Sequence, residues 1–173
     1  MNNLEVLMER HDVSVNELSK TTGISRQSIY NTDETLTPHL QNIIKYSLFF
    51  NVKVDEFIGL VSLPTTLNKI NRNSLSISIK TEEMLDNFKK FLYNLKSELE
   101  LGVDEFSELI KLKKDTVHSL LHHDNYPSFE TLSVICNDTG ILMDDILNYR
   151  LFWRVYKFYD DRRSKIKLSN HGK

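Results

Sequence analysis

Between residues 25 and 31 the chain gathers side chains that can form paired hydrogen bonds. The guanidinium of Arg26 is followed by the carboxamides of Gln27 and Asn31, with the hydroxyl groups of Ser25 and Ser28 beside them. A guanidinium or a carboxamide can make two hydrogen bonds to one partner at once, which gives geometric specificity. These residue types are therefore suited to recognising a binding partner through paired hydrogen bonds.

Two short helices joined by a tight turn would position this set. Ser14 is a natural N-cap, and Glu17 three residues later completes a capping box. Gly23 supplies the positive φ that a sharp turn needs. Ile24 and Ile29 then point into a core and leave the polar set on the outer side. This is the plan of a helix-turn-helix, whose second helix enters the major groove of DNA.

Composition places the chain among ordinary globular proteins. It has 173 residues, of which 40% are apolar and 27% charged, enough for one domain or two small ones. Only 5 Gly and 3 Pro favour long helices over a many-turned β fold. One cysteine, Cys136, excludes an internal disulfide framework and suits a reducing compartment. We expect an all-α cytoplasmic protein with no membrane segment.

The first 60 residues predict five helices, because apolar residues recur at helical spacing in five short runs. Their order and spacing resemble the lambda-repressor/Cro-like family, also called the xenobiotic-response-element type, from residue 4 to about 58. The matching positions are Leu18-Ser19, Gly23-Ile24-Ser25, Ile29, Pro38, Leu40, Ile43, Val52 and Val54-Asp55-Glu56-Phe57. The chain departs from the family pattern at Val15, where glutamine is usual, and at Asp33-Glu34-Thr35.

The resemblance implies a sequence-specific DNA-binding transcriptional regulator of phage or mobile-element type, a repressor or autorepressor that binds a palindromic operator as a dimer. Arg26 would read guanine, and Gln27 and Asn31 would read adenine. Ser25 and Ser28 suit phosphates, while Tyr30 suits a sugar or a thymine methyl group. The expected DNA-binding residues are Ser25, Arg26, Gln27, Ser28, Tyr30, Asn31 and Thr35. The rival interpretation is a solvated helix face in a protein-binding module.

Residues 61–80 interrupt the helical pattern and read as a linker. Within it, Leu75, Ile77 and Ile79 alternate with polar residues. Residues 75–79 are therefore either a short β-strand that pairs with a second subunit or an extended connector, and the connector is favoured.

Residues 81–147 look like a second copy of the same fold, since a shift of 88 residues aligns their apolar positions with those of the first half. Six Lys and Arg against twelve Asp and Glu leave residues 84–147 with a charge of −6, which opposes binding to DNA. The copy would serve dimerisation, bind a protein or bind DNA weakly. Its candidate surface is Lys111, Lys113, Lys114, Asp115 and His118.

Residues 148–173 predict an aromatic helix followed by a basic tail, which we expect to be frayed and solvated. A helix that is apolar on nearly all sides must pack on something, and the other domain or a second subunit is the expected partner. Together with the first helix of the second copy, expected at about 81–99, it supplies a candidate dimer surface. The residues chosen for that surface are Phe91, Leu99, Phe152, Trp153 and Tyr156.

A second resemblance gives a hypothesis of another class. The stretch from His11-Asp12 through Leu18-Ser19-Lys20 to Thr22-Gly23-Ile24-Ser25 is similar to the N-terminal domain of some anti-CRISPR proteins from phages of Gram-positive bacteria. The resemblance implies a bifunctional protein. Its first domain would repress its own promoter, and residues 81–173 would bind and inhibit a Cas nuclease or another protein target.

Catalysis is not expected. His118 and His122 lie four residues apart on one helix, but the chain has neither a CxxC nor an HExxH pattern to complete a metal site. It also has no glycine-rich phosphate loop and no nucleophile with a neighbouring base. We therefore expect no enzyme activity, no metal and no cofactor.

Overall fold

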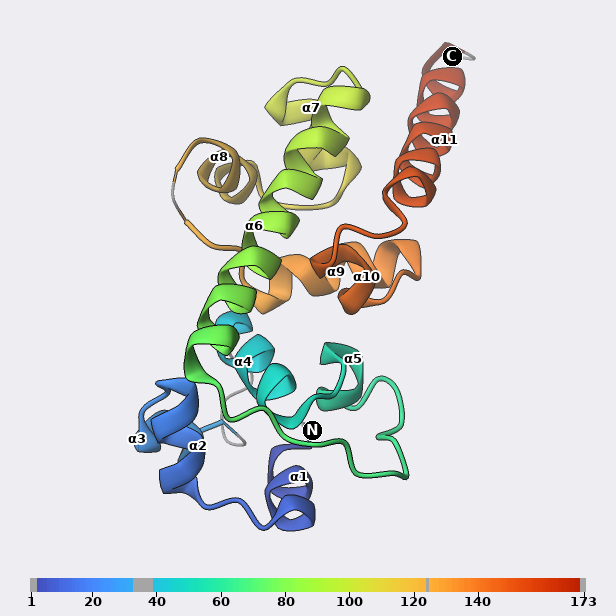
Figure 1. Cartoon of the computed structure of the whole chain (residues 1–173). Coiled ribbons are helices and arrows are strands. Elements are labelled where there is room, and N and C mark those ends of the chain that lie inside the picture. The colour runs from blue at the N-terminus through green and yellow to red at the C-terminus, as the bar shows by residue number, and fades with distance from the viewer. Residues whose placement is uncertain (1–2, 33–38, 124, 172–173) are drawn as a thin grey trace. The chain divides into compact units, whose positions relative to one another are not determined.

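The computed structural model describes residues 3–32, 39–123 and 125–171, with side chains described to residue 167. These residues are all helical outside their connections, with no β-strand among them (Figure 1). They divide into two compact units, residues 1–83 and residues 84–173. The helices are α1 (Leu4–His11), α2 (Val15–Thr22), α3 (Arg26–Tyr30), α4 (Leu40–Phe50), α5 (Val54–Phe57), α6 (Ser74–Glu98), α7 (Val103–Leu109), α8 (Lys114–His122), α9 (Phe129–Thr139), α10 (Met143–Leu147) and α11 (Phe152–His171).

The first unit, unit 1, is built on α4, which presents apolar side chains around most of its circumference. Phe49 and Phe50 at its C-terminal end are fully buried and make an edge-to-face contact at 4.9 Å between ring centroids. Helices α1, α2, α3 and α5 each add one or two apolar anchors to this core. The anchors are Leu4, Leu7, Leu18, Ile24, Ile29, Val54 and Phe57. The five-helix order expected for residues 1–60 is therefore present, although Pro38, the expected start of the fourth helix, lies outside the described residues.

The segment expected to be a linker is partly bound to unit 1. The backbone N–H of Asn71 donates to the carbonyl of Phe49 at 2.7 Å, and the side chain of Asn68 donates to the carbonyl of Asn51 at 2.8 Å. Ile70 between them is buried. Residues 68–72 thus extend the fold of unit 1, and the prediction of a linker over all of 61–80 is wrong.

The alternating run at 75–79 is helical, so both the strand and the extended connector are wrong for these residues. Helix α6 begins at Ser74, behind Asn73, whose side chain accepts a hydrogen bond from the N–H of Ser76 at 2.9 Å. Ile77 is buried while Leu75 and Ile79 are 69% and 57% exposed. Ile77 instead lies on the apolar stripe that continues further along α6. The buried residues therefore follow the 3.6-residue repeat of a helix and not the two-residue repeat of a strand. The helix therefore starts seven residues before its expected position.

The second unit, unit 2, contains four shorter helices in the order and spacing of α2 to α5. Helices α7 and α8 begin 88 residues after α2 and α3, and α9 and α10 begin 89 residues after α4 and α5. Phe106, Ile110, Val117, Leu132 and Ile146 are buried along them. Asp55 in α5 and Asp144, 89 residues later in α10, are both buried. The core of unit 2 thus repeats much of the pattern of unit 1.

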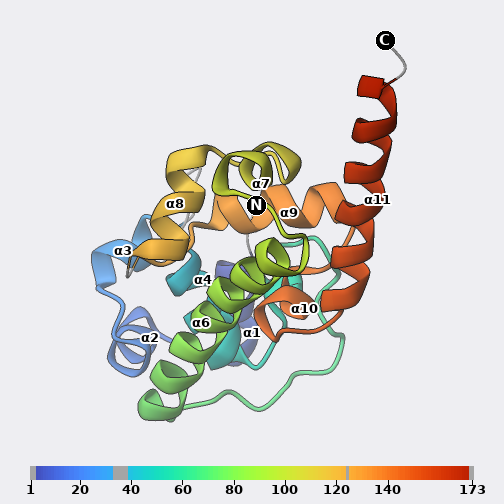
Figure 2. The same ribbon diagram turned by 90° about the horizontal axis from the view of Figure 1, so that it is seen from above.

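Helix α11 packs on its own unit, contrary to the expectation that another domain or subunit would cover it. Val155 and Tyr159 are fully buried, and Figure 2 shows α11, in red, running beside one end of α9. Arg162 donates to the carbonyl of Leu109 at 3.1 Å and forms a two-armed ion pair with Asp138 of α9. The prediction of a frayed, solvated tail is therefore wrong at least as far as Arg163. The guanidinium of Arg163 donates to the carbonyl of Leu99 at 2.6 Å.

The same packing removes three residues from the expected dimer surface. Phe91 and Leu99 are 0% exposed, and Phe152 is 8% exposed, because they face the interior of unit 2. The aromatic helix α11 of the same chain covers the apolar stripe of α6. Sequence periodicity shows that this stripe must be covered, but not which element covers it. Trp153 remains 64% exposed and Tyr156 is half-buried.

Candidate nucleic-acid interface

Helix α2 is closed at both ends by local contacts. The hydroxyl oxygen of Ser14 accepts a hydrogen bond from the N–H of Glu17 at 3.2 Å, which satisfies one of the free donors of the first turn. At the other end Gly23 has a φ of +70°, and its N–H donates to the carbonyl of Ser19 at 2.9 Å. A side chain at position 23 would be strained by this φ although the space around it is open. The chain therefore turns sharply into α3.

A buried threonine fixes the turn between the two helices. The Thr22 hydroxyl donates to the carbonyl of Leu18 at 2.7 Å and accepts from the N–H of Ile24 at 3.3 Å. Ile24 and Ile29 are 4% and 3% exposed and anchor the following helix to the core. These contacts set the direction in which α3 leaves the turn.

Helix α3 presents a polar outer face. Ser25 caps it by accepting from the N–H of Ser28 at 3.1 Å, and the two hydroxyl oxygens are 2.8 Å apart. Of the seven residues that the sequence predicts to bind DNA, Ser25, Arg26, Gln27, Ser28 and Tyr30 are exposed, and Asn31 is half-buried. Thr35, the seventh, lies outside the described residues. The structure thus brings six of these side chains onto one short helix and its caps.

Hydrogen bonds orient the three side chains expected to read bases. The guanidinium of Arg26 donates to the side-chain oxygen of Asn16 in α2 at 3.3 Å. The Gln27 amide donates to the side-chain oxygen of Asn31 at 2.9 Å. The sequence prediction missed Asn16, whose one signal was a carboxamide in the first turn of α2. Pre-orientation of this kind lowers the entropic cost of forming a paired contact.

The C-terminal end of α3 is anchored in the core. The Thr32 hydroxyl donates to the carbonyl of Ser28 at 2.7 Å and lies 3.1 Å from the hydroxyl of Tyr46. Tyr46 is fully buried and stacks on Phe57, with ring centroids 5.5 Å apart. Since both ends of α3 are fixed, its outer face is held rigidly with respect to α2 and α4.

Charges beside the helix pair are partly balanced. Glu17 of α2 forms an ion pair with Arg72 at 2.7 Å, which offsets a carboxylate that would otherwise repel phosphates. Burial lowers the pKa of His11 below its ordinary value of 6.5, and the charges of Arg10 and Arg72 lower it further. His11 is therefore protonated less readily than an ordinary histidine.

The corresponding surface of unit 2 has its lysines bound to carboxylates. Lys114, the first residue of α8, forms an ion pair with Asp104 at 2.7 Å, and this hydrogen bond raises the pKa of Lys114. Lys111 forms one with Asp138 at 2.8 Å. Lys113, Asp115 and His118 are exposed, and the His118 ring lies against His122 and His123, with ring centroids 4.7 Å and 5.7 Å away. Much of the positive charge expected at this surface is thus neutralised within the unit.

Two further features of the described residues bear on other classes of protein. Among the described residues, no three His, Cys, Asp or Glu side chains are grouped so that they could hold a metal ion. No helix in that part of the chain has both the length and the apolar character needed to span a membrane.

The helix pair and its caps define unit 1 as a helix-turn-helix module. Residues 3–62 match the family model of the Cro/C1-type HTH DNA-binding domain, which covers α1 to α5. The match supports a DNA-binding transcription regulator with a lambda-repressor/Cro-like module. No curated protein and no solved structure matches the chain.

Proposed function

We propose that this protein is a transcriptional repressor of phage or mobile-element type, which acts in the cytoplasm and binds a palindromic operator as a homodimer. The observation that carries the proposal is the pre-oriented set of Arg26, Gln27 and Asn31, the first two exposed and the third half-buried, on the helix-turn-helix of a Cro/C1-type domain.

The proposed contacts follow from the chemistry of each side chain. Arg26 would donate two hydrogen bonds to O6 and N7 of guanine, and Gln27 and Asn31 would pair with N6 and N7 of adenine. Ser25 and Ser28 would contact phosphates and fix the register of the helix, while Tyr30 would pack on a sugar or thymine methyl. A single module of this size reads few bases, so two copies on a palindrome supply the missing specificity.

A gel-shift titration on DNA from upstream of the protein's own coding sequence tests the proposal. Arg26→Ala and Gln27→Ala should each weaken specific binding by about 1–3 kcal/mol. Lys69→Ala removes the same charge as Arg26→Ala from an exposed position outside the helix pair and should change binding much less. Sedimentation should give two protomers per operator. Unchanged binding by both α3 variants would contradict the proposal.

In the same proposal, residues 84–147 are a second, diverged copy of the module that has lost DNA binding. Helix starts that repeat at intervals of 88 and 89 residues support this origin. The charge of −6 and the ion pairs of Lys111 and Lys114 support the loss of phosphate contacts. Lys114→Ala should therefore leave operator binding unchanged in the titration above.

The second candidate function is a bifunctional anti-CRISPR-type protein. The observation that favours it is the excess of acidic residues in 84–147, with six Lys and Arg against twelve Asp and Glu, which would suit a basic nucleic-acid site on a Cas nuclease or another protein target. Inhibition of DNA cleavage by the full chain, unaffected by Arg26→Ala, would support this role. Absence of inhibition, together with operator binding, would leave the repressor as the sole proposal.

A further inference from the structure

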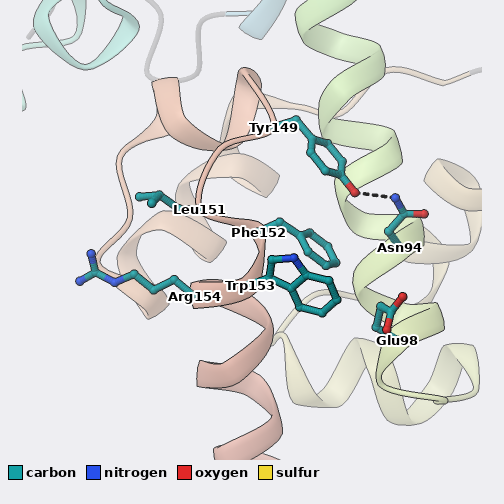
Figure 3. Close-up of a pocket in the computed structure, with 7 residues that line it drawn as sticks. All are labelled: Asn94, Glu98, Tyr149, Leu151, Phe152, Trp153 and Arg154. Carbon is teal, nitrogen blue, oxygen red and sulfur yellow. Dashed lines mark hydrogen bonds between the residues drawn. The ribbon is translucent and has the colours of Figure 1, made fainter.

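Unit 2 contains an open pocket between the second half of α6 and the start of α11 (Figure 3). Its volume is about 610 Å³, within the range of small-molecule sites, which is about 300–1,000 Å³. It is lined by Asn94, Glu98, Tyr149, Leu151, Phe152, Trp153 and Arg154. None of these residues belongs to the helix-turn-helix surfaces described above, so the proposed DNA binding does not account for the pocket.

The pocket wall is an ordered group of aromatic rings. Tyr149 and Phe152 are stacked, with centroids 5.6 Å apart and an angle of 6° between the rings. Trp153 meets Phe152 edge-on at 5.2 Å and Tyr156 at 5.5 Å. The indole of Trp153 is nevertheless 64% exposed. An indole that is held by its neighbours and still open to solvent offers a π surface to a ligand.

The backbone beside the pocket is strained. Tyr149 and Leu151 have φ angles of +55° and +58°, in the left-handed region that costs energy for residues other than glycine. In unit 1 the position that follows the C-cap of α5 is Gly59, with a φ of +80°, and in unit 2 the position that follows the C-cap of α10 is Tyr149. Tyr149 is held there by a hydrogen bond from the side chain of Asn94 and by its stack on Phe152. The left-handed angle at Tyr149 also ends α10, where the N–H of Arg150 donates to the carbonyl of Asp145.

The charge that faces the rings is negative. Figure 3 shows the carboxylate of Glu98 across the pocket from Trp153, while the guanidinium of Arg154 extends away on the other side, beyond Leu151. The nearby Arg150 is bound to Asp145 at 3.2 Å. A carboxylate beside an exposed aromatic cluster favours a cation, because the ring quadrupole and the carboxylate both attract positive charge.

We infer that this pocket binds a small organic cation, with the rings of Tyr149, Phe152 and Trp153 against its apolar part and Glu98 as its counter-ion. The expected ligand is an ammonium compound that carries either an aromatic ring or a quaternary nitrogen. The inference goes beyond the proposed function, because it assigns unit 2 a small-molecule site that is independent of operator binding.

Trp153 is the chain's one tryptophan, so its fluorescence reports binding directly. Titration of the full chain with benzyltrimethylammonium should give saturable quenching, and benzyl alcohol, a neutral compound with the same ring, should quench far less. Glu98→Gln should weaken binding of the cation about tenfold. Glu82→Gln, which removes an exposed carboxylate from the same helix sixteen residues earlier, should leave it unchanged. Trp153→Leu, followed by calorimetry, should abolish the binding heat.

Three outcomes would overturn the inference. Equal quenching by the alcohol and the ammonium compound would mean that the pocket is a general apolar site. No binding of the ammonium compound, with binding of an arginine-rich peptide, would assign the pocket to a side chain of a protein partner. Dissociation of a dimer by Trp153→Leu in sedimentation, without any ammonium binding to the wild type, would assign it to a second copy of this chain.

Discussion

In each unit a basic residue begins the second helix of a turn pair and binds a side chain ten positions earlier, but the two partners differ. In unit 1 Arg26 donates to the neutral carboxamide of Asn16, so its charge is oriented and remains available. In unit 2 Lys114 forms an exposed ion pair with the carboxylate of Asp104, so a negative charge lies directly beside its ammonium group. The partner side chain, a carboxamide in unit 1 and a carboxylate in unit 2, therefore gives the two surfaces a different local charge.

The units also differ in how they complete their cores. Unit 1 ends α4 with the buried aromatic pair Phe49 and Phe50. In α9 of unit 2 the positions 89 residues later are Asp138 and Thr139, and the missing apolar volume is supplied by α11. The same arrangement of helices can therefore complete its core with its own aromatic residues or with an added helix, and in unit 2 the Asp138–Arg162 ion pair joins that helix to α9.

The largest effect is expected from breaking the Asp138–Arg162 pair. Asp138→Asn leaves Arg162 without its buried carboxylate and should lower the free energy of unfolding of unit 2 by about 3 kcal/mol. Urea unfolding followed by Trp153 fluorescence measures this loss. Asp145→Asn removes a carboxylate whose partner Arg150 is 57% exposed, and it should cost less than about 1 kcal/mol. Equal losses in both variants would show that α11 is not fixed by the ion pair.

The same pair predicts how acid affects unit 2. Burial opposes ionisation of Asp138, but hydrogen bonds and charges from Arg162 and Lys111 prevail and lower its pKa from 3.8 to about 2. A carboxyl whose pKa is lower in the folded state stabilises fully above its ordinary pKa, and this contribution disappears as the pH falls through about 2. The stability difference between wild type and Asp138→Asn should therefore shrink between these two pH values.

Exchange of the partner side chain tests the first difference. Asn16→Asp gives Arg26 the carboxylate that Lys114 has, and it should weaken operator binding by about 1–3 kcal/mol, the range for loss of a paired base contact. Gel-shift titration measures the change. Asn51→Asp adds the same negative charge at an exposed position outside the helix pair and controls for the change in net charge. The explanation of the difference fails if the two variants weaken binding equally.

Helix caps should give effects near 1 kcal/mol and of opposite sign in the two units. Ser25 caps α3 with its hydroxyl group, whereas α8 begins behind Lys113 without a side-chain cap. Ser25→Ala should destabilise unit 1 by about 1 kcal/mol, and Lys113→Ser should stabilise unit 2 by about 0.5–1 kcal/mol. Thermal unfolding followed by circular dichroism measures both, with Ser97→Ala on the exposed side of α6 as the neutral control.

The smallest effect is expected at the ends of α4 and α9. Asn51 and Gly140, 89 residues apart, both adopt left-handed backbone angles, with φ of +54° and +69°. Gly140→Asn should cost a few tenths of a kcal/mol because asparagine tolerates this region, whereas Gly140→Ala should cost about 1 kcal/mol. The open space at Gly140 excludes a steric cause. Urea unfolding that gives equal losses for the two variants would contradict a purely conformational explanation.

Local signals made the helix-turn-helix predictable from the sequence. Ser14, Gly23 and Ser25 act within a few residues of their own positions, so the bounds of α2 and the outer face of α3 followed from them. The order of the first five helices followed from apolar residues that recur at helical spacing. The role of Asn16 was not predicted, because its contact with Arg26 depends on the angle at which α2 and α3 cross.

Errors arose where a short pattern had two solutions or where partners lie far apart in the chain. Five alternating residues at 75–79 are compatible both with a strand and with one turn of a longer helix. The side chain of Asn73 caps the helix that begins at Ser74, which favours the helix over the strand. Burial of Phe91 and Leu99 depends on α11, which starts more than fifty residues later and is fixed by the pairing of Asp138 with Arg162. Apolar spacing predicts that such residues are covered without showing what covers them.

The reactivity of the buried cysteine can be used to measure how fast unit 2 opens locally, separately from unit 1. Cys136 is the chain's single thiol and is 6% exposed within α9, so a thiol reagent can reach it only when that part of unit 2 opens. The position 89 residues earlier, Ser47, is 2% exposed and donates to the carbonyl of Ile43 at 2.8 Å. A Cys136→Ser, Ser47→Cys double variant would move the thiol into unit 1. Labelling kinetics of the two proteins would then time the opening of each unit separately.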